Sequence, residues 1–267
     1  MLFRSEAARA RDLARVDARR EAVEGVARAQ RHHDLLERRV ARALADAVDR
    51  DLDLARACLH VAEDAYPGLD IEGYAGEIER FAAQLRARLA PGAAVEDRIL
   101  ALNELLFAEL GFRGNTRRYY DPRNSYLNEV IDRRRGIPIT LAVLYAEIGR
   151  RIDLPLEGVS FPGHSLVRLP LRGGMLVLDP FSGGTPLDED ELRARLKRVI
   201  PPEALATPAG RVPLSDLPLD QFLAPASKRQ ILARLLRNLK AIYRETDRPE
   251  QLLAVLNRML VVAPDAA

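Results

Sequence analysis

Tryptophan is absent from this chain of 267 residues, and cysteine occurs once, as Cys58. A single cysteine excludes an intramolecular disulfide framework and a multi-cysteine metal site. No apolar run approaches the roughly 18 residues that a membrane-spanning helix needs, and the first residues lack the apolar segment of a secretory signal. These absences predict a cytoplasmic protein with no membrane partner.

Lysine is also scarce, with three residues among 41 basic ones, and the net charge is only +2. Acidic residues are interleaved with the arginines, and the densest basic cluster is "DRRRG" at Asp132 to Gly136. A nucleic-acid surface needs a basic face, preferably with stacking aromatic side chains. We therefore expect no nucleic-acid partner and interpret the arginines as a solvated face or a protein contact.

Hydrophobic residues make up 48% of the chain, which suffices for one large core or two small ones. Residues 1–47 have only a weak apolar stripe, so we expect a loosely attached helix or a partly disordered extension there. Apolar spacings of three and four residues predict helices over 54–65, 71–89 and 99–110. The same spacing predicts a further helix that begins near Pro138.

After this helix the pattern changes to short β-type runs. "LEGVSF", "SLVRL" and "MLVLDP" are separated by the turn signals "PG" and "LRGG", which indicates an α+β fold. A proline-rich stretch, 201–226, is typical of a linker or a lid. Residues 227–267 predict two antiparallel helices, which must dock on the body to bury their apolar stripes. The predicted units are therefore 1–47, 48–200, 201–226 and 227–267.

One of the four histidines, His164, directly precedes a predicted strand. A hairpin with its turn near Leu171 and Arg172 pairs Leu166 with Val177 and places His164 opposite Asp179. A carboxylate beside an imidazole fixes its tautomer and raises its basicity, as in a nucleophile–His–Asp triad. A register slip of one residue would separate the two side chains. The alternative is a structural His–Asp pair at a strand edge.

Such a pair needs a nucleophile, and a thiol is most reactive at a helix N-terminus. The helix before these strands begins instead with Pro138, which cannot act as a nucleophile and has no N–H. Thr140 is a weak alternative nucleophile, because a hydroxyl in a first helical turn often bonds to the backbone. Cys58 lies on an apolar stripe, so we expect a buried and inert thiol there.

The loop "FRGNTRRYYDPRNS" is long and bears aromatic residues, which is typical of a functional segment. Asn124 and Asn128 either orient a ligand or cap turns. Tyr120 either lines a cleft or packs in the core, and Arg135 either holds an acidic group or forms part of a solvated face. The sequence contains no phosphate-binding glycine loop and no metal-ligand spacing, so we expect neither a cofactor nor a metal ion.

The order of several of these residues along the chain also resembles the motif of a known protein family. Gly136, Pro138, Ala142, His164 and Asp179-Pro180 resemble the pattern Gly-x-Cys-x-x-x-Ala, His, Asp-Pro of the transglutaminase/papain-like core, with Pro138 in the cysteine position. More closely, "GFRGN", "YYDPRNSYLNEV", "RRRGIPITLAVLY" and "LPLEGVSFPGH" resemble bacterial SirB-type proteins, a transglutaminase-like family with C-terminal tetratricopeptide-like helices. The resemblance implies a central helix packed on a small antiparallel sheet, a helical N-terminal region and a C-terminal helical hairpin.

The resemblance does not by itself imply catalysis, and three functions remain open. The first is a non-catalytic or regulatory module that binds a protein or peptide through the former active-site cleft and the tail. The second is an active hydrolase or acyltransferase that uses His164 and Asp179 with Thr140 or a histidine-activated water. The third is a scaffold. The second function requires that His164 face a concave pocket, with Asp179 on one ring nitrogen and the other nitrogen free.

Overall fold

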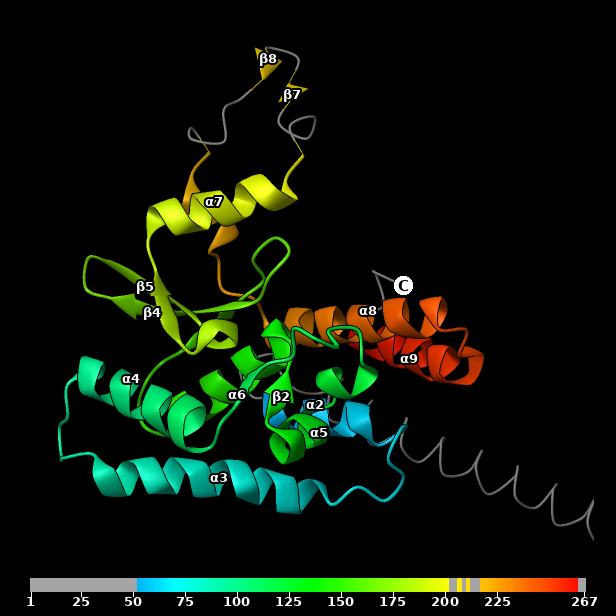
Figure 1. Cartoon of the computed structure of the whole chain (residues 1–267), viewed down its shortest axis with the longest axis horizontal. Helices are drawn as coiled ribbons and strands as arrows, with labels where there is room; N and C mark the ends of the chain where they lie inside the picture. The colour runs from blue at the N-terminus through cyan, green and yellow to red at the C-terminus, as the bar shows by residue number, and fades with distance from the viewer. Residues whose placement is uncertain (1–51, 202–205, 208–209, 212–216, 264–267) are drawn as a thin grey trace, which may run out of the picture.

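The computed structural model describes residues 52–201, 206–207, 210–211 and 217–263 (Figure 1). The predicted extension 1–47 lies outside the described residues, as does part of the predicted linker 201–226. Within the described residues, no helix combines the length and the apolar character that crossing a membrane requires.

The helices surround a central one. They are α2 (Leu54–Ala62), α3 (Ile71–Arg88), α4 (Val95–Asn103), α5 (Leu127–Arg133), α6 (Pro138–Arg150), α7 (Glu189–Val199), α8 (Lys228–Glu245) and α9 (Pro249–Val262). The short turns are the π-helix η2 (Glu104–Glu109) and the 3-10 turns η3 (Pro122–Ser125), η4 (Pro180–Ser182) and η7 (Leu219–Phe222). The helix predicted over 99–110 is therefore the end of α4 continued by a wider π-helical turn.

Strands make up a smaller part of the fold. One sheet holds β3 (Glu157–Val159), β4 (Leu166–Leu171), β5 (Gly174–Asp179) and β6 (Thr185–Leu187), all antiparallel and in chain order. A parallel pair joins β1 (Arg113–Gly114) to β2 (Arg135–Gly136), and an antiparallel pair joins β7 (Ala206–Thr207) to β8 (Gly210–Arg211). Mixed helices and small sheets agree with the predicted class.

The central helix α6 is buried along almost its whole length. Every residue from Pro138 to Gly149 is buried, which explains why its apolar residues are not confined to one stripe. Proline is well tolerated at the first helical position because its missing N–H has no intrahelical partner there. The N–H of Ile137 is instead satisfied by the side chain of Thr140, at 3.1 Å.

The predicted register of the β4–β5 hairpin is wrong by two residues. The prediction pairs Leu166 with Val177, but in the structure Val177 pairs with Arg168. In the same way, Leu178 pairs with Val167. The reason is the turn, which contains Gly173 with a φ of 90°. Glycine adopts this left-handed conformation without strain, so the turn forms one position later than predicted.

A shift of two residues leaves every side chain on its expected face. Val167 and Leu178 belong to the main hydrophobic core with α6. Leu166 and Val177 point to the opposite face and pack in a second cluster with Leu196 of α7. The sheet is thus covered by α6 on one face and α7 on the other (Figure 1).

The last part of the proline-rich stretch, residues 217–226, packs on the body. Leu223 is buried in the cluster beneath α7, and its carbonyl accepts a hydrogen bond of 2.9 Å from Arg168. The N–H of Ala226 donates to the carbonyl of Gly158 at 2.8 Å, so this segment runs along the edge of β3. Helix α8 then packs against α2, α6 and η3, and α9 packs on α8.

Candidate functional site

His164 and Asp179 meet at one end of the sheet. His164 lies in a turn before β4, where its N–H bonds to the carbonyl of Phe161 at 3.1 Å, and Asp179 is the last residue of β5. The Nε2 atom of His164 is 2.9 Å from Oδ1 of Asp179. The two side chains therefore meet despite the shifted register, because the shift kept them on the same face of the sheet.

The carboxylate of Asp179 is fully buried and accepts three further hydrogen bonds. Arg195 of α7 and the hydroxyl of Ser182 donate to Oδ2 at 2.8 and 2.9 Å, and the N–H of Phe181 donates to Oδ1 at 3.1 Å. Burial alone favours the neutral acid, but the bonds from His164, Arg195 and Ser182 outweigh it and hold the pKa of Asp179 at about 2. Asp179 is thus ionised at neutral pH and orients the imidazole.

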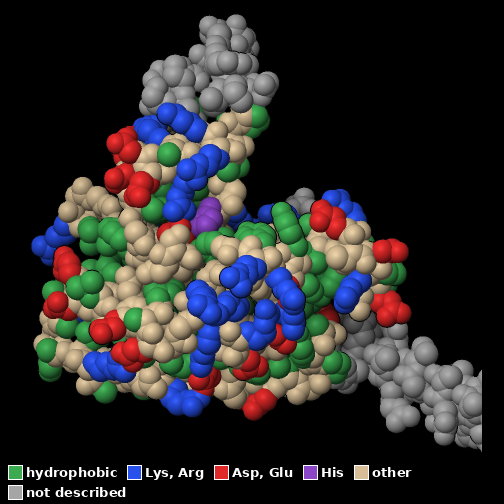
Figure 2. Space-filling model, in the orientation of Figure 1, with side chains coloured by type: hydrophobic (Ala, Val, Ile, Leu, Met, Phe, Trp, Pro, Cys, Tyr) green, Lys and Arg blue, Asp and Glu red, His purple; other side chains and the backbone are tan. Residues whose placement is uncertain are grey.

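His164 borders a cleft beneath α7, in the hollow visible in Figure 2. Arg195, Arg198 and Val199 of α7 line one side of this cleft, and Pro162 lies at its edge. The side chain of His164 is 18% exposed, and its Nδ1 atom has no hydrogen-bond partner among the described residues. This nitrogen is free to accept a proton or to bond to a ligand.

A row of aromatic rings leads from His164 to the surface. The ring centroids of His164 and Phe181 are 5.8 Å apart, those of Phe181 and Tyr119 6.4 Å, and those of Tyr119 and Tyr120 5.3 Å, all edge-to-face. Tyr120, a predicted cleft residue, is 72% exposed at the far end of the row. It lies near the cleft without lining it.

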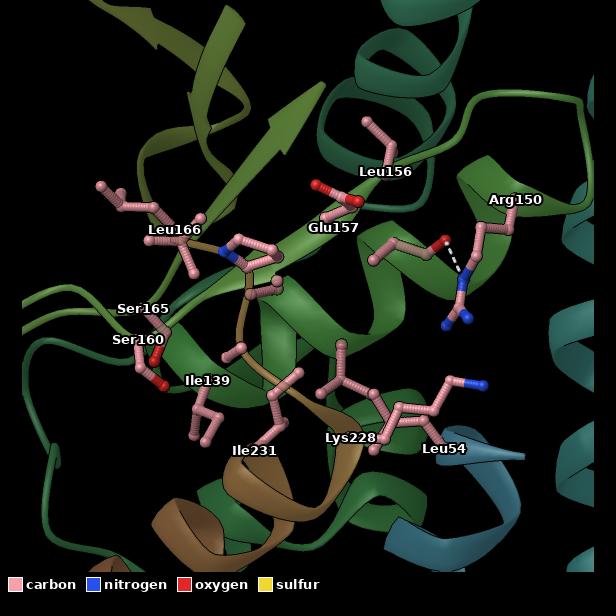
Figure 3. A pocket seen from close by; sticks show the side chains of 17 residues that line it. Leu54, Ile139, Arg150, Leu156, Glu157, Ser160, Ser165, Leu166, Lys228 and Ile231 are labelled. Carbon is pink, nitrogen blue, oxygen red and sulfur yellow. Dashed lines mark hydrogen bonds between the residues drawn. The ribbon is translucent and has the colours of Figure 1, made fainter. Parts of the chain in front are cut away.

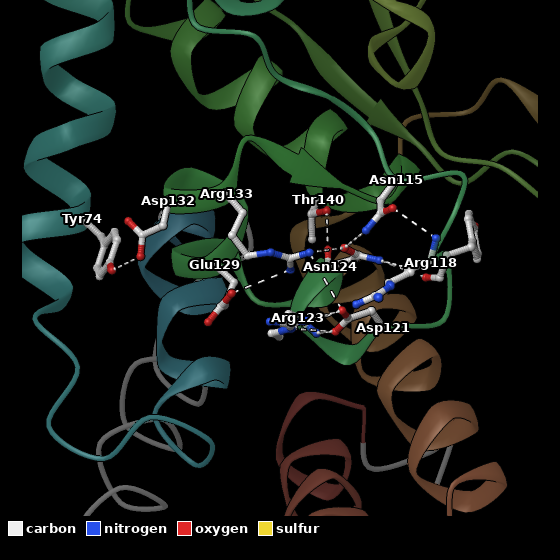
Figure 4. Close-up of polar contacts among 11 residues, drawn as sticks. Tyr74, Asn115, Arg118, Asp121, Arg123, Asn124, Glu129, Asp132, Arg133 and Thr140 are labelled. Carbon is white, nitrogen blue, oxygen red and sulfur yellow. Dashed lines mark hydrogen bonds and ion pairs between the residues drawn. The ribbon is translucent and has the colours of Figure 1, made fainter.

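Asn124, for which the sequence leaves ligand binding and turn capping open, organises its own loop. It is fully buried, and its Nδ2 donates to the carbonyls of Arg118 and Tyr119 at 2.7 and 3.2 Å (Figure 4). Its Oδ1 accepts a 2.9 Å bond from Asn115. These bonds hold the loop that carries the two tyrosines, so Asn124 shapes the surface from inside.

Thr140 and Pro138 also lie inside the protein. The hydroxyl of Thr140 donates to the carbonyl of Asn124 at 2.8 Å and accepts the N–H of Ile137 (Figure 4). Pro138 is buried at the start of α6. Neither residue lines the cleft of His164, so the structure does not bring the hydroxyl of Thr140 into it.

The remaining candidates occupy other places. Nη1 of Arg135 donates to the carbonyls of Gly111 and Arg134 at 3.4 and 3.0 Å, which secures the β1–β2 pair. Asn128 is buried on α5, and its Oδ1 has no partner among the described residues. Burial raises the pKa of Cys58 to about 12, in agreement with an inert thiol. In the described part of the chain, no group of acidic, histidine or cysteine side chains could hold a metal ion.

Helix α7, which carries Arg195 and Arg198, was not predicted from the sequence. Signals for this helix were present: Asp188 caps it by accepting the N–H of Glu191, whose side chain accepts the N–H of Asp188 in return. The buried residues Leu192 and Leu196 are four positions apart. Nothing in the sequence indicated that Arg195 bonds to Asp179, which precedes it by 16 residues.

Comparison with known proteins gives the family. Residues 72–237 match the profile of the Transglutaminase-like superfamily. This chain belongs to that superfamily. The transglutaminase-like match begins in α3 and ends in α8, so it includes the His164 cleft and part of the C-terminal hairpin.

Bacterial relatives support this assignment. The transglutaminase-like chain is 44% identical over 223 residues to a UPF0162 protein of Xylella fastidiosa, which covers 84% of this chain and 76% of the relative. It is 30% identical to a UPF0162 protein of Pseudomonas aeruginosa over 80% of this chain and 73% of the relative. A shorter match, 46% identical over 68 residues, covers 26% of this chain and 11% of human F-box only protein 21. No solved structure matches the chain significantly.

Proposed function

We propose that this transglutaminase-like chain is a binding module that holds an acidic segment of a partner protein in the cleft beside His164. Pro138 supports a non-catalytic role, because it stands where the resemblance places the nucleophilic cysteine. The one thiol, Cys58, is buried on α2 and does not line the cleft. Thr140 has its hydroxyl engaged with the backbone.

The observation that carries the proposal is the unbalanced positive charge of the cleft. Among the described residues, Asp179 is the one acid that lines the cleft, and its carboxylate is already bonded to Arg195. Arg198 is exposed and has no carboxylate partner among the described residues. A guanidinium binds a carboxylate through two parallel hydrogen bonds, so this cleft favours aspartate or glutamate side chains.

The aromatic row extends the binding surface away from the cleft. Tyr119 and Tyr120 offer rings on which a peptide can pack, and Arg234 of α8 lies close to Tyr119 while donating to the carbonyl of Phe161 at 2.9 Å. Tyrosine and arginine are the residues that protein interfaces favour. An extended acidic segment would thus contact both α7 and the tyrosine loop.

The C-terminal hairpin is the second part of the proposed module. Leu253 and Leu260 stand seven residues apart on α9 and are 60% and 56% exposed. Residues at this spacing share one face of a helix. We include this face as a contact for the same partner, as in a tetratricopeptide-like arrangement.

Fluorescence anisotropy with labelled hexaglutamate tests the cleft. We expect wild type to bind this peptide and not hexalysine, and Arg198→Gln to weaken binding by about two- to fivefold. Arg172→Gln is the matched control, because Arg172 is an exposed arginine in the β4–β5 turn. Equal effects of the two substitutions would mean that the peptide is attracted by general charge and not by the cleft.

One observation favours hydrolysis as a second candidate function. His164 has Asp179 on Nε2 while Nδ1 is free beside the cleft, which is the arrangement required of a general base. In this reaction Nδ1 takes a proton from water as the water oxygen attacks the acyl carbon of an ester. The tetrahedral intermediate then breaks its bond to the leaving oxygen and releases the acid and the alcohol, and the imidazolium returns the proton to the leaving oxygen or to solvent. The test is the rate at which the protein hydrolyses p-nitrophenyl acetate. In His164→Ala this rate must fall to that of free imidazole or below. An unchanged rate in that variant removes this candidate.

A further inference from the structure

Another cavity lies between α6, β3 and the start of α8 (Figure 3). Its volume is about 230 Å³, and none of the described residues that line it also lines the His164 cleft. Ser160 and Pro225 at its border are exposed, which gives a small molecule a way in. The function proposed above does not use this cavity, so its role is a separate question.

The interior of the cavity is apolar. Ile139, Val143 and Ala146 stand on one face of α6, and Leu156 and Ile231 of α8 lie around them (Figure 3). In another protein, an engineered cavity of about 150 Å³ with aliphatic and aromatic walls stays dry and binds benzene. By the same measure, the larger cavity of this chain has room for an apolar molecule of about eight to ten heavy atoms.

The charged side chains that line one end of the cavity already have partners. Arg150 pairs with Glu147 of the preceding helical turn. Lys228 donates to a backbone carbonyl at 2.6 Å, and Glu157 is bonded to Arg168 at 2.7 Å. An ionised ligand would lose its water here and would have to compete with these existing bonds. The cavity therefore favours a neutral molecule.

At the other end, the hydroxyl of Ser165 is buried and lacks a partner. Ser165 is 6% exposed and lines the cavity on the same side as Ser160 (Figure 3). Its hydroxyl makes no hydrogen bond to any of the described residues. A hydroxyl that has left water without a new partner costs free energy. A ligand oxygen at this end would supply the missing partner.

We propose that this cavity binds a small neutral molecule with an apolar body and one carbonyl group, which accepts a hydrogen bond from Ser165. The lining from α6 and α8 holds the apolar body, and the hydroxyl sets its orientation. A carbonyl oxygen only accepts, so it brings no donor of its own that would need a further partner. Acetophenone has this chemistry and is the probe. Benzoate has nearly the same shape with a negative charge, and ethylbenzene lacks the oxygen.

Methyl NMR of isoleucine-labelled protein locates the binding. Titration with acetophenone to about 5 mM should shift the methyl signals of Ile139 and Ile231, which line the cavity. The signal of Ile78, buried on α3, should stay in place and report an intact fold. We expect benzoate to bind at least about tenfold more weakly, because its charge must leave water. Absence of shifts at Ile139 and Ile231, or benzoate that binds as well as acetophenone, overturns the proposal.

Ser165→Ala separates the hydrogen bond from the shape of the cavity. It removes the hydroxyl and leaves the apolar lining, so the affinity for acetophenone should fall about fivefold while that for ethylbenzene does not fall. Ser125→Ala is the matched control, because Ser125 on η3 is also buried with an unpartnered hydroxyl but does not line the cavity. It should change neither affinity. An unchanged affinity of Ser165→Ala for acetophenone, or an equal loss for both ligands, contradicts the proposed hydrogen bond.

Filling the cavity should abolish the binding of both ligands. Ala146→Leu places a larger side chain in the middle of the lining on α6. If this buried substitution unfolds the protein, as the Ile78 signal will show, Ala226→Leu at the half-buried edge of the cavity replaces it. A folded leucine variant that still binds acetophenone as wild type does would place the ligand elsewhere.

Discussion

At the scale of single residues, Asp179 is the most constrained polar group of the site. Four hydrogen bonds reach a carboxylate that has no exposed surface. Its partners come from three elements, namely the turn before β4, η4 and α7. The carboxylate of Asp179 therefore holds these three elements together, whether or not a ligand binds the free Nδ1 of His164.

We predict that Asp179→Asn lowers the free energy of unfolding by about 2 kcal/mol at pH 7. The folded-state pKa of about 2 lies below the ordinary value of 3.8. The stabilisation from the ionised form is therefore complete above about pH 4 and is lost as the pH falls toward 2. Urea unfolding of wild type and variant at pH 7 and at pH 2.5 should show the difference shrinking in acid.

Asp190→Asn is the control for Asp179→Asn, because Asp190 is exposed in the first turn of α7. It should change the free energy of unfolding by no more than about 0.5 kcal/mol. If Asp179→Asn costs the same amount at both pH values, its ionised carboxylate is not the source of the stability.

Thr140 allows a structural role to be separated from a catalytic one. Thr140→Val removes the bonds to the N–H of Ile137 and the carbonyl of Asn124 and should cost about 1–2 kcal/mol of unfolding free energy. Thr185→Val, at an exposed position on β6, should cost less than about 0.5 kcal/mol. Loss of ester hydrolysis in a Thr140→Val protein of unchanged stability would instead identify a nucleophile.

At the scale of elements, the C-terminal hairpin is joined to the body by buried polar contacts as well as by apolar packing. The hydroxyls of Tyr126 and Tyr243 are 2.5 Å apart in the interior. Arg258 of α9 is buried and makes two 2.9 Å bonds to Asp64, just beyond α2. A bidentate pair of this kind fixes orientation as well as distance.

We predict that Arg258→Met destabilises the protein by about 2 kcal/mol, because it leaves Asp64 without its partner near the interior. Arg244→Met, at an exposed position near the end of α8, is the control and should be nearly neutral. Chemical denaturation of the Arg258→Met and Asp64→Asn single variants and of the double variant gives the coupling free energy between the two side chains. Arg244→Met is measured beside them. Strictly additive losses would show that the pair does not join hairpin and body.

At the scale of the whole molecule, one large hydrophobic core joins the sheet to most of the described helices, α7 excepted. Residues of α2, α3, α6, α8 and α9 all belong to this core. Leu232, Leu236 and Leu239 of α8 are buried in it beside Leu141 and Leu144 of α6. The sequence predicts units at 48–200 and 227–267, with the second docked on the first, and the shared core is the reason to expect that their stability is coupled.

We therefore predict one cooperative unfolding transition for the full chain. A chain that ends at residue 226 loses the α8 side of the core and should not fold. Circular dichroism at far- and near-ultraviolet wavelengths during urea unfolding should give coincident curves for the full chain, and no transition for the shortened one. Two separated transitions, or a stable shortened chain, would indicate independent domains.

Some features followed from local sequence patterns alone. Spacings of three and four apolar residues predicted the helix that begins at Pro138 and the two helices of the tail, because one face of each must be buried. The two-residue period of strands put His164 and Asp179 on one face. This face survived an error of two in the register, since only an odd shift reverses it.

Other features were decided by contacts between segments distant in sequence. The sequence could not choose between ligand binding and turn capping for Asn124, because its partners depend on how the tyrosine loop closes. Arg195 reaches Asp179 only because α7 covers that face of the sheet. The cavity between α6 and α8 depends on how the hairpin docks. Periodicity determines which face of an element is buried, whereas tertiary packing determines which other element covers it and what space remains between them.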